Sequence, residues 1–144
     1  MSKSMFFSIT VVLLITGSSW ADYPSKKLLK AIAIKESGDN DKAIGDKGFR
    51  EHAYGHLQIR RPCIDDVNKK FGTHHKAKEC LGNRELSEWT CKEYINMHAT
   101  SKALHKLPTD ESMCRIWNGG PHGYKKTSTV KYWVKIQKIL KTLG

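Results

Sequence analysis

Hydrophobic residues recur every three or four positions after Ser25, which is the spacing of one face of an α-helix. These apolar positions are Leu28, Leu29, Ile32 and Ala33, and lysines occupy the other faces. Ser25 follows a proline and is a suitable N-cap, while Gly38 provides a stop signal. The pattern therefore predicts an amphipathic helix between Ser25 and Gly38.

The pattern changes after this helix. Residues 38–48 are rich in glycine and aspartate, which favours turns over regular structure. Residues 54–59 have strand-forming side chains over a short length, so we expect a small hairpin or irregular strands that line one side of a cleft. Pro62 and the residues after it predict the start of a helix, and residues 71–83 predict an exposed loop.

Three further helices complete the predicted fold. One runs from Ser87 to about Leu107, and a short one begins at Thr109 or Asp110 and ends at two glycines and a proline. The closing helix begins at Ser128 or Thr129, with a core stripe formed by Trp133, Ile136, Leu140 and Leu143. We therefore expect an α+β protein, mainly α-helical, with two lobes that meet at a groove.

The first 21 residues have the pattern of a secretory signal peptide. A lysine precedes an apolar run over residues 5–15, and Ser19-Trp20-Ala21 forms a small-x-small cleavage site. The run is too short to span a bilayer comfortably, and no other run approaches that length. We expect a secreted, extracellular protein (periplasmic if bacterial), with residues 22–144 forming one catalytic domain and no integral membrane segment.

Four cysteines follow the predicted cleavage site, at Cys63, Cys80, Cys91 and Cys114. None of their gaps gives a C-x-x-C motif, which argues against a zinc knuckle or a redox pair. In an exported chain the even number favours two disulfides. Three pairings are possible, and we prefer Cys63 with Cys80 and Cys91 with Cys114.

The chain is strongly basic, with a formal charge of +11 at pH 7. Lys3 is the only charged residue in the predicted signal, so 24 basic and 14 acidic side chains remain after cleavage. This balance favours an anionic partner such as nucleic acid, a membrane surface or a bacterial wall. No nucleic-acid-binding motif accompanies the charge, so we expect anionic cell-wall polymers and not nucleic acid.

Glu36 departs from the amphipathic pattern of the first predicted helix. It lies four positions after Ile32 and three after Ala33, so it projects from the apolar side. It also lies at the C-terminal end of the helix, where the macrodipole disfavours a negative charge. Both effects would raise the pKa of its carboxyl, as a general acid near neutral pH requires. A glutamate at a helix end is more often a solvated surface residue, so position alone assigns no role.

Several short blocks follow Glu36 in a fixed order. Glu36-Ser37 is followed by Gly45-Asp46-Lys47-Gly48, Gly55-His56-Leu57-Gln58-Ile59, Trp117-Asn118-Gly119-Gly120 and Lys131-Tyr132-Trp133. This order resembles the goose-type lysozymes and soluble lytic transglycosylases (SLT family) of the lysozyme-like superfamily. His56 replaces a large apolar residue of that pattern, and Trp117 replaces a tyrosine. The resemblance covers most of the chain after residue 24 and implies a lysozyme-like fold with a small β element lining the substrate groove.

The resemblance also implies an activity and a set of site residues. The substrate would be bacterial peptidoglycan, cut at the β-1,4 bond between N-acetylmuramic acid and N-acetylglucosamine, with Glu36 protonating the leaving oxygen. Tyr132 would touch and orient the Glu36 carboxyl. The other expected substrate-binding residues are Ser37, Tyr54, Gln58, Asn118 and Tyr124. Asn118 suits this role chemically, because a side-chain amide offers an N-acetyl group both a donor and an acceptor.

Asp46 decides which reaction we expect. In goose-type lysozymes an aspartate of the matching loop helps to hold an attacking water, and Asp46 occupies that place. A second aspartate of that family is Arg60 here, which weakens the match at the water site. Lytic transglycosylases need no such water, because a substrate hydroxyl attacks and an anhydro-sugar results. We favour hydrolysis because Asp46 is present.

Other functions stay open from the sequence. The chain could be a wall-binding protein that lost its chemistry, or a cationic antimicrobial protein that disrupts membranes. We expect no cofactor and no metal, because the adjacent His74 and His75 have no third ligand at suitable spacing. We expect a monomer.

Overall fold

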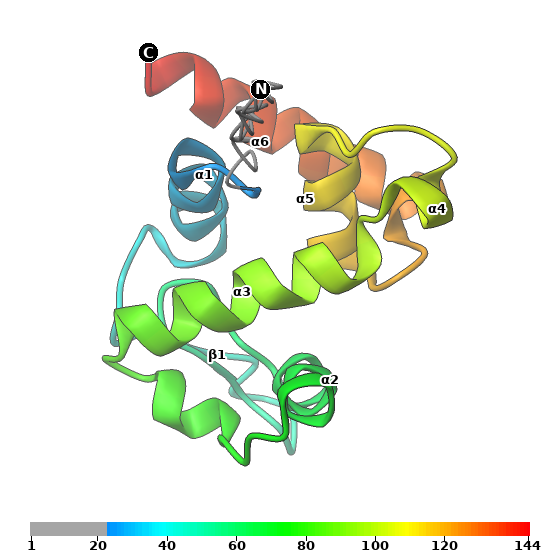
Figure 1. Ribbon diagram of the computed structural model, residues 1–144. Helices are drawn as coiled ribbons and strands as arrows, with labels where there is room; N and C mark the ends of the chain where they lie inside the picture. Colours follow the sequence, from blue (N-terminus) through cyan, green and yellow to red (C-terminus); the bar gives the residue numbers. More distant parts are fainter. Residues whose placement is uncertain (1–22) are drawn as a thin grey trace, which may run out of the picture.

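The computed structural model describes residues 23–144, so the predicted signal peptide lies outside the described residues. The mainly helical prediction is confirmed (Figure 1). In chain order the elements, with η for 3-10 helices, are α1 (Lys26–Ser37), β1 (Ile44–Gly45), β2 (Ala53–Tyr54), α2 (Arg61–Phe71), η1 (Ala77–Cys80), α3 (Arg84–His98), α4 (Ser101–Leu104), α5 (Asp110–Gly119), η2 (Gly123–Lys125), η3 (Thr127–Thr129) and α6 (Val130–Thr142).

Helix α1 forms where the sequence predicts it. The Leu28 amide donates to the Ser25 hydroxyl at 3.1 Å, and Gly38 ends the helix in the left-handed conformation with φ 68°. Glycine adopts this conformation without the penalty that a Cβ would add. The four residues of the predicted apolar stripe are all buried. Local sequence signals therefore set both ends and the inward face of this helix.

The helices form two groups on either side of α3, which runs across the middle of the molecule (Figure 1). On one side α6 packs against both α1 and α5, and on the other α2 packs against α3. The fully buried side chains that join these elements include Leu28, Ile32, Leu57, Ile95, Ile116 and Ile136. This core holds the end of α1 opposite the small sheet.

The sheet is a two-stranded antiparallel hairpin in which Ile44 lies opposite Tyr54. A further bridge joins Tyr54 to Ile59. A Cβ on Gly45 would lie 1.9 Å from Oε1 of Gln58, so a larger residue there would displace that side chain. The hairpin is short, as expected, but its first strand lies within residues 38–48, which were predicted to form turns, and Tyr54 is the one residue of the predicted segment 54–59 that lies in a strand. Gln58 packs directly onto the hairpin.

Two segments differ from the sequence prediction. Residues 71–83 contain η1, and Cys80 within it is fully buried, so this segment is not simply an exposed loop. The helix predicted from Ser87 to Leu107 begins earlier, at Arg84, and ends at His98. Thr100 then caps the separate helix α4, because its hydroxyl accepts from the Ala103 amide at 3.1 Å.

The closing helix also departs in one detail. Ile136 is fully buried as predicted, but Leu143 is 37% exposed and lies beyond the last turn. Tyr132 takes a buried position instead. Aromatic residues of this helix therefore contribute more to the interior than its C-terminal leucine does.

All four cysteines are free thiols in this structure, so neither predicted disulfide is formed. Cys80, Cys91 and Cys114 are buried. Burial raises the pKa of Cys80 to about 11. Burial also raises the pKa of Cys91 well above its ordinary value, and the neighbouring Cys63 and Cys114 add to that rise. The cysteines thus lie within one region of the core.

No helix in the described part of the chain is long and apolar enough to cross a membrane.

Candidate active site

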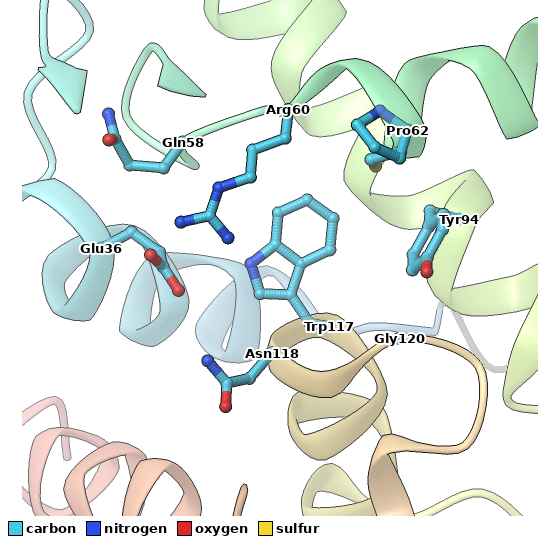
Figure 2. Close-up of a pocket in the computed structure, with 9 residues that line it drawn as sticks. Glu36, Gln58, Arg60, Pro62, Tyr94, Trp117, Asn118 and Gly120 are labelled. Carbon is cyan, nitrogen blue, oxygen red and sulfur yellow. The ribbon is translucent and has the colours of Figure 1, made fainter. Parts of the chain in front are cut away.

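A pocket of about 210 Å³ lies where the end of α1, the segment after β2 and the end of α5 meet (Figure 2). The nine residues that line it are Glu36, Gln58, Arg60, Pro62, Cys63, Tyr94, Trp117, Asn118 and Gly120. Three residues that the sequence singled out, Glu36, Gln58 and Asn118, are therefore brought together. Glu36 and Asn118 lie more than 80 residues apart in the chain.

Glu36 projects into this pocket from the last turn of α1 (Figure 2). Burial raises the pKa of its carboxyl above the ordinary value of 4.5. A hydrogen bond from Tyr132 and the charges of Lys35 and Arg60 oppose that rise, whereas the charge of Asp46 adds to it. The net direction is upward, which favours a carboxyl that holds its proton.

Tyr132 of α6 contacts the carboxyl of Glu36. Its hydroxyl donates to Oε1 of Glu36 at 2.6 Å, which joins α6 to α1 across 96 residues of sequence. Burial and the adjacent carboxyl both raise the pKa of Tyr132, so it stays a neutral donor. The Lys35 ammonium lies 5.4 Å from the centre of the Tyr132 ring. The predicted contact between Tyr132 and Glu36 is thus present in the structure.

Asp46 lies outside the pocket lining, on the turn that follows β1. Its φ of 54° is in the left-handed region, which aspartate tolerates better than most residues. Arg60 Nε donates to Asp46 Oδ2 at 2.6 Å, and this is the contact that fixes the carboxylate. Because Arg60 lines the pocket, the ion pair connects Asp46 to the site.

Gln58 and Asn118 line the pocket in different ways. The Gln58 amide nitrogen donates to the backbone oxygens of Gly55 at 2.9 Å and Ala43 at 3.4 Å, so it also holds the hairpin together. Asn118 is exposed near the end of α5. Its side-chain amide makes no hydrogen bond within residues 23–144, so both its donor and its acceptor are open to a ligand.

Four expected substrate-binding residues do not line this pocket, and one of them, Tyr132, contacts Glu36 instead. Ser37 donates to the His56 carbonyl at 2.8 Å and accepts from the Asn40 amide, so its hydroxyl is used within the fold. Tyr124 donates to the Ala103 carbonyl at 2.9 Å and joins η2 to α4. Tyr54 faces a separate hollow between the hairpin and α2.

The pocket also contains aromatic residues that the sequence did not identify as site residues. Trp117 and Tyr94 pack edge to face, with ring centres 5.9 Å apart, and both line the pocket. The Trp117 indole nitrogen lies on the side facing Glu36 and Arg60 (Figure 2). Trp117 directly precedes Asn118, so the motif that identified the asparagine also contained this signal.

His56, the departure from the expected motif, is buried beneath the loop after α1. Its ring Nδ1 lies 3.3 Å from Asp41, and burial lowers its pKa, so it is held neutral. Arg84 of α3 pairs with Asp41 at 2.8 Å and with Asp39 at 3.0 Å. These contacts tie the loop that carries Asp46 to α3.

The part of the chain that the structure describes contains no cluster of three or more side chains suited to hold a metal ion.

Comparisons with known proteins place this geometry among lysozymes, although no protein-family model matches the chain. The chain is 31% identical to invertebrate-type lysozyme 3 of Caenorhabditis elegans, covering 77% of this chain and 83% of that protein. It is 31% identical to an invertebrate-type lysozyme of Ruditapes philippinarum, covering 80% and 81%. Among solved structures it resembles Meretrix lusoria lysozyme in complex with Aeromonas hydrophila PliI, with a TM-score of 0.67, 27% identity and coverage of 80% and 89%.

Proposed function

The chain belongs to the invertebrate-type lysozymes, and we propose that it is a muramidase that hydrolyses the β-1,4 bond between N-acetylmuramic acid and N-acetylglucosamine in bacterial peptidoglycan. The goose-type and transglycosylase assignment from the motifs is not confirmed, because the relatives are of a different lysozyme type. The lysozyme-like fold expected from those motifs is confirmed.

The observation that carries the proposal is the state of Glu36. Cleavage of a glycosidic bond needs a carboxylic acid that remains protonated until it donates to the leaving oxygen. Burial raises the pKa of Glu36, and the Tyr132 hydroxyl fixes Oε1 while the carboxyl faces an open pocket. Asn118 lies across the same pocket, where its free amide can bind an N-acetyl group.

Asp46 is the residue that we assign to the attacking water. It is held by Arg60 on the hairpin side of the pocket, and its charge contributes to the raised pKa of Glu36. A carboxylate in this position can orient a water toward the sugar, as hydrolysis requires. This assignment supports hydrolysis over the transglycosylase reaction, in which no water takes part.

We further propose that the protein is exported and acts on the wall from outside the cell that makes it. The basic surface suits capture by an anionic wall polymer, because opposite charges raise the local concentration of the enzyme. The predicted signal peptide at residues 1–21 is the reason for expecting export.

Substitution of Glu36 by glutamine tests the proposal. The amide keeps the shape of the carboxyl but cannot donate an acidic proton, so lysis of purified peptidoglycan should fall by about 10²- to 10⁴-fold. Glu85→Gln is the matched control, because Glu85 is exposed at the start of α3, away from the pocket. It should leave lysis unchanged.

Mass spectrometry of the wild-type products then separates the two reactions. Hydrolysis leaves an ordinary reducing end, whereas products lighter by one water would identify a lytic transglycosylase. Normal lysis by a folded Glu36→Gln protein would remove Glu36 from the mechanism, and a wild-type protein that binds walls without cleaving them would identify a wall-binding protein.

A further inference from the structure

We propose that Arg60 is a specificity-determining residue that binds a carboxylate carried on the O3 substituent of N-acetylmuramic acid. The inference rests on the proposed muramidase function and names the part of the substrate that distinguishes peptidoglycan from a neutral N-acetylglucosamine polymer. Of the nine residues that line the pocket, Arg60 carries the positive charge and Glu36 the ionisable acid.

The guanidinium of Arg60 has N–H donors that are free to bind a ligand. Its Nε is used by Asp46 at 2.6 Å, and within residues 23–144 its two terminal nitrogens make no further hydrogen bond. The side chain is 60% exposed, so a ligand in the pocket can reach it. Figure 2 shows the guanidinium directed into the pocket between Glu36 and Trp117.

The ion pair with Asp46 prepares this group for a second anion. Arginine presents its five N–H groups in one rigid plane, so a partner on the Nε side fixes the direction of the terminal nitrogens. Two parallel N–H groups from such a plane match the two oxygens of a carboxylate. Asp46 therefore orients Arg60 as much as Arg60 orients Asp46.

The chemistry of the substrate places an anion nearby. The bond that Glu36 would protonate starts at C1 of the muramic acid ring, and the lactyl group is attached at O3 of the same ring. Its carboxyl is a free carboxylate where no stem peptide is attached, and where a stem peptide is amide-linked to it the peptide carries carboxylates of its own. The two sites are thus within one sugar ring of each other. N-acetylglucosamine has the same ring without the lactyl group, so a carboxylate-binding residue beside Glu36 is placed to tell the two sugars apart.

A bound carboxylate would also favour the acid form of Glu36. The positive charge of Arg60 is among the influences that oppose the upward pKa of Glu36. A carboxylate on the terminal nitrogens would offset that charge, and the effect would be present only with the acidic substrate bound. Binding and proton retention would then act in the same direction.

The test compares Arg60→Gln with Arg61→Gln. Arg61 is the next residue, carries the same charge and pairs with Glu51 and Asp65 on the far side of the turn without lining the pocket. Binding is measured in a Glu36→Gln background, so that no ligand is cleaved. The ligands are an N-acetylglucosamine oligomer and an alternating N-acetylglucosamine–N-acetylmuramic acid oligomer of equal length with a free lactyl carboxylate.

We expect Arg60→Gln to weaken binding of the acidic oligomer about tenfold more than binding of the neutral one, the scale of one charge-assisted hydrogen bond. Arg61→Gln should leave this preference unchanged. A preference that is unchanged in Arg60→Gln, whether both affinities fall together or neither does, would overturn the inference and leave Arg60 as a support for Asp46 alone.

Two further ligands locate the carboxylate. An oligomer with its lactyl group converted to the neutral amide should lose the tenfold difference if the lactyl carboxylate is the one bound. An oligomer with stem peptides should regain it if a peptide carboxylate is bound instead. A charge preference without any cleavage by the wild-type protein would contradict the proposed function but support the carboxylate site.

Discussion

The two carboxylates that we propose for the site are held by very different parts of the molecule. Glu36 lies at the end of a capped helix, packed against α6, with its carboxyl bonded by the buried Tyr132. Asp46 lies on a turn with φ 54°, and its side chain is held by an arginine that is itself 60% exposed. One side of the site is therefore built into the core and the other rests on a surface ion pair.

This difference suits the two tasks. A general acid needs a raised pKa, and burial provides it through packing that does not depend on solvent ions. A residue that orients water and borders the substrate needs access to solvent, which an exposed turn provides. The cost is precision, because an exposed ion pair contributes only about 0.2–1 kcal/mol to holding a side chain.

The largest effect that tests this contrast is expected on the turn. Asp46→Asn keeps the size of the side chain but removes the charge that Arg60 holds, so the water should be misplaced. Such a displacement can lower kcat by up to about a hundredfold. The loss should stay below that of Glu36→Gln, because nearby polar groups can still hold water. Initial rates on a soluble oligosaccharide measure it.

Asp65→Asn is the control for this measurement. Asp65 is exposed and paired with Arg61, away from Glu36, so its loss should not change the rate. A full wild-type rate for Asp46→Asn, with reducing ends still produced, would assign the water to another residue.

A smaller effect is expected on the buried side. Tyr132→Phe removes the hydroxyl and keeps the ring that packs beside Lys35. Burial raises the pKa of Glu36 and the Tyr132 hydrogen bond opposes that rise, so the variant should hold the Glu36 proton to higher pH. The alkaline limb of the pH–rate profile should therefore move upward. We expect kcat to fall about two- to tenfold, the scale of one net hydrogen bond. An alkaline limb that stays in place would show that Tyr132 does not act on this proton, and one that moves downward would show that its hydroxyl favours the protonated carboxyl.

The same contrast explains what the sequence could and could not predict. Glu36 was found because its helix is defined locally, by Ser25, Gly38 and a stripe of apolar residues whose spacing is readable. Its contact with Tyr132 spans 96 residues and came from the motif resemblance, not from any local pattern. Core positions are thus predictable where periodicity or a known motif reports them.

Side-chain hydroxyls were harder to place. Ser37 and Tyr124 have suitable chemistry for sugars, but each donates to a backbone carbonyl from a distant segment. Nothing in their local sequence shows that these carbonyls would be near. Arg60 and Trp117 appear in the sequence as departures from the motif, but their place in the pocket is not predictable for the same reason, since it depends on neighbours in space and not in sequence. The break between α3 and α4 was also missed, because the chain there contains neither glycine nor proline.

The smallest predicted effect is on the free energy of unfolding. Its dependence on pH has opposite signs for Glu36 and for Asp39. Glu36 has a raised pKa from burial, so it is neutral in both states below pH 4.5 and its ionisation favours the unfolded chain as pH rises. Asp39, in the loop that leads to Asp46, shows the reverse. Burial opposes its ionisation, but hydrogen bonds from Lys30 and Arg84 outweigh burial and lower its pKa. Its stabilising contribution is therefore present above pH 3.8 and is lost as pH falls through its folded pKa.

Urea unfolding of the wild type, Glu36→Gln and Asp39→Asn between pH 3 and 8 measures how the stability contribution of each carboxyl depends on pH. The wild type should lose stability relative to Glu36→Gln as pH rises from below 4.5 through the folded pKa of Glu36. Relative to Asp39→Asn it should instead gain stability as pH rises through the acid range, by about 1 kcal/mol at most, because the ion pairs of Asp39 involve partly exposed side chains. If the stability difference from the wild type changed with pH in the same direction for both variants, burial would disfavour the ionised form of Asp39 as it does that of Glu36. The contrast between a core-built acid and an ion-paired loop would then fail, because both sides of the site would owe their charge state to desolvation.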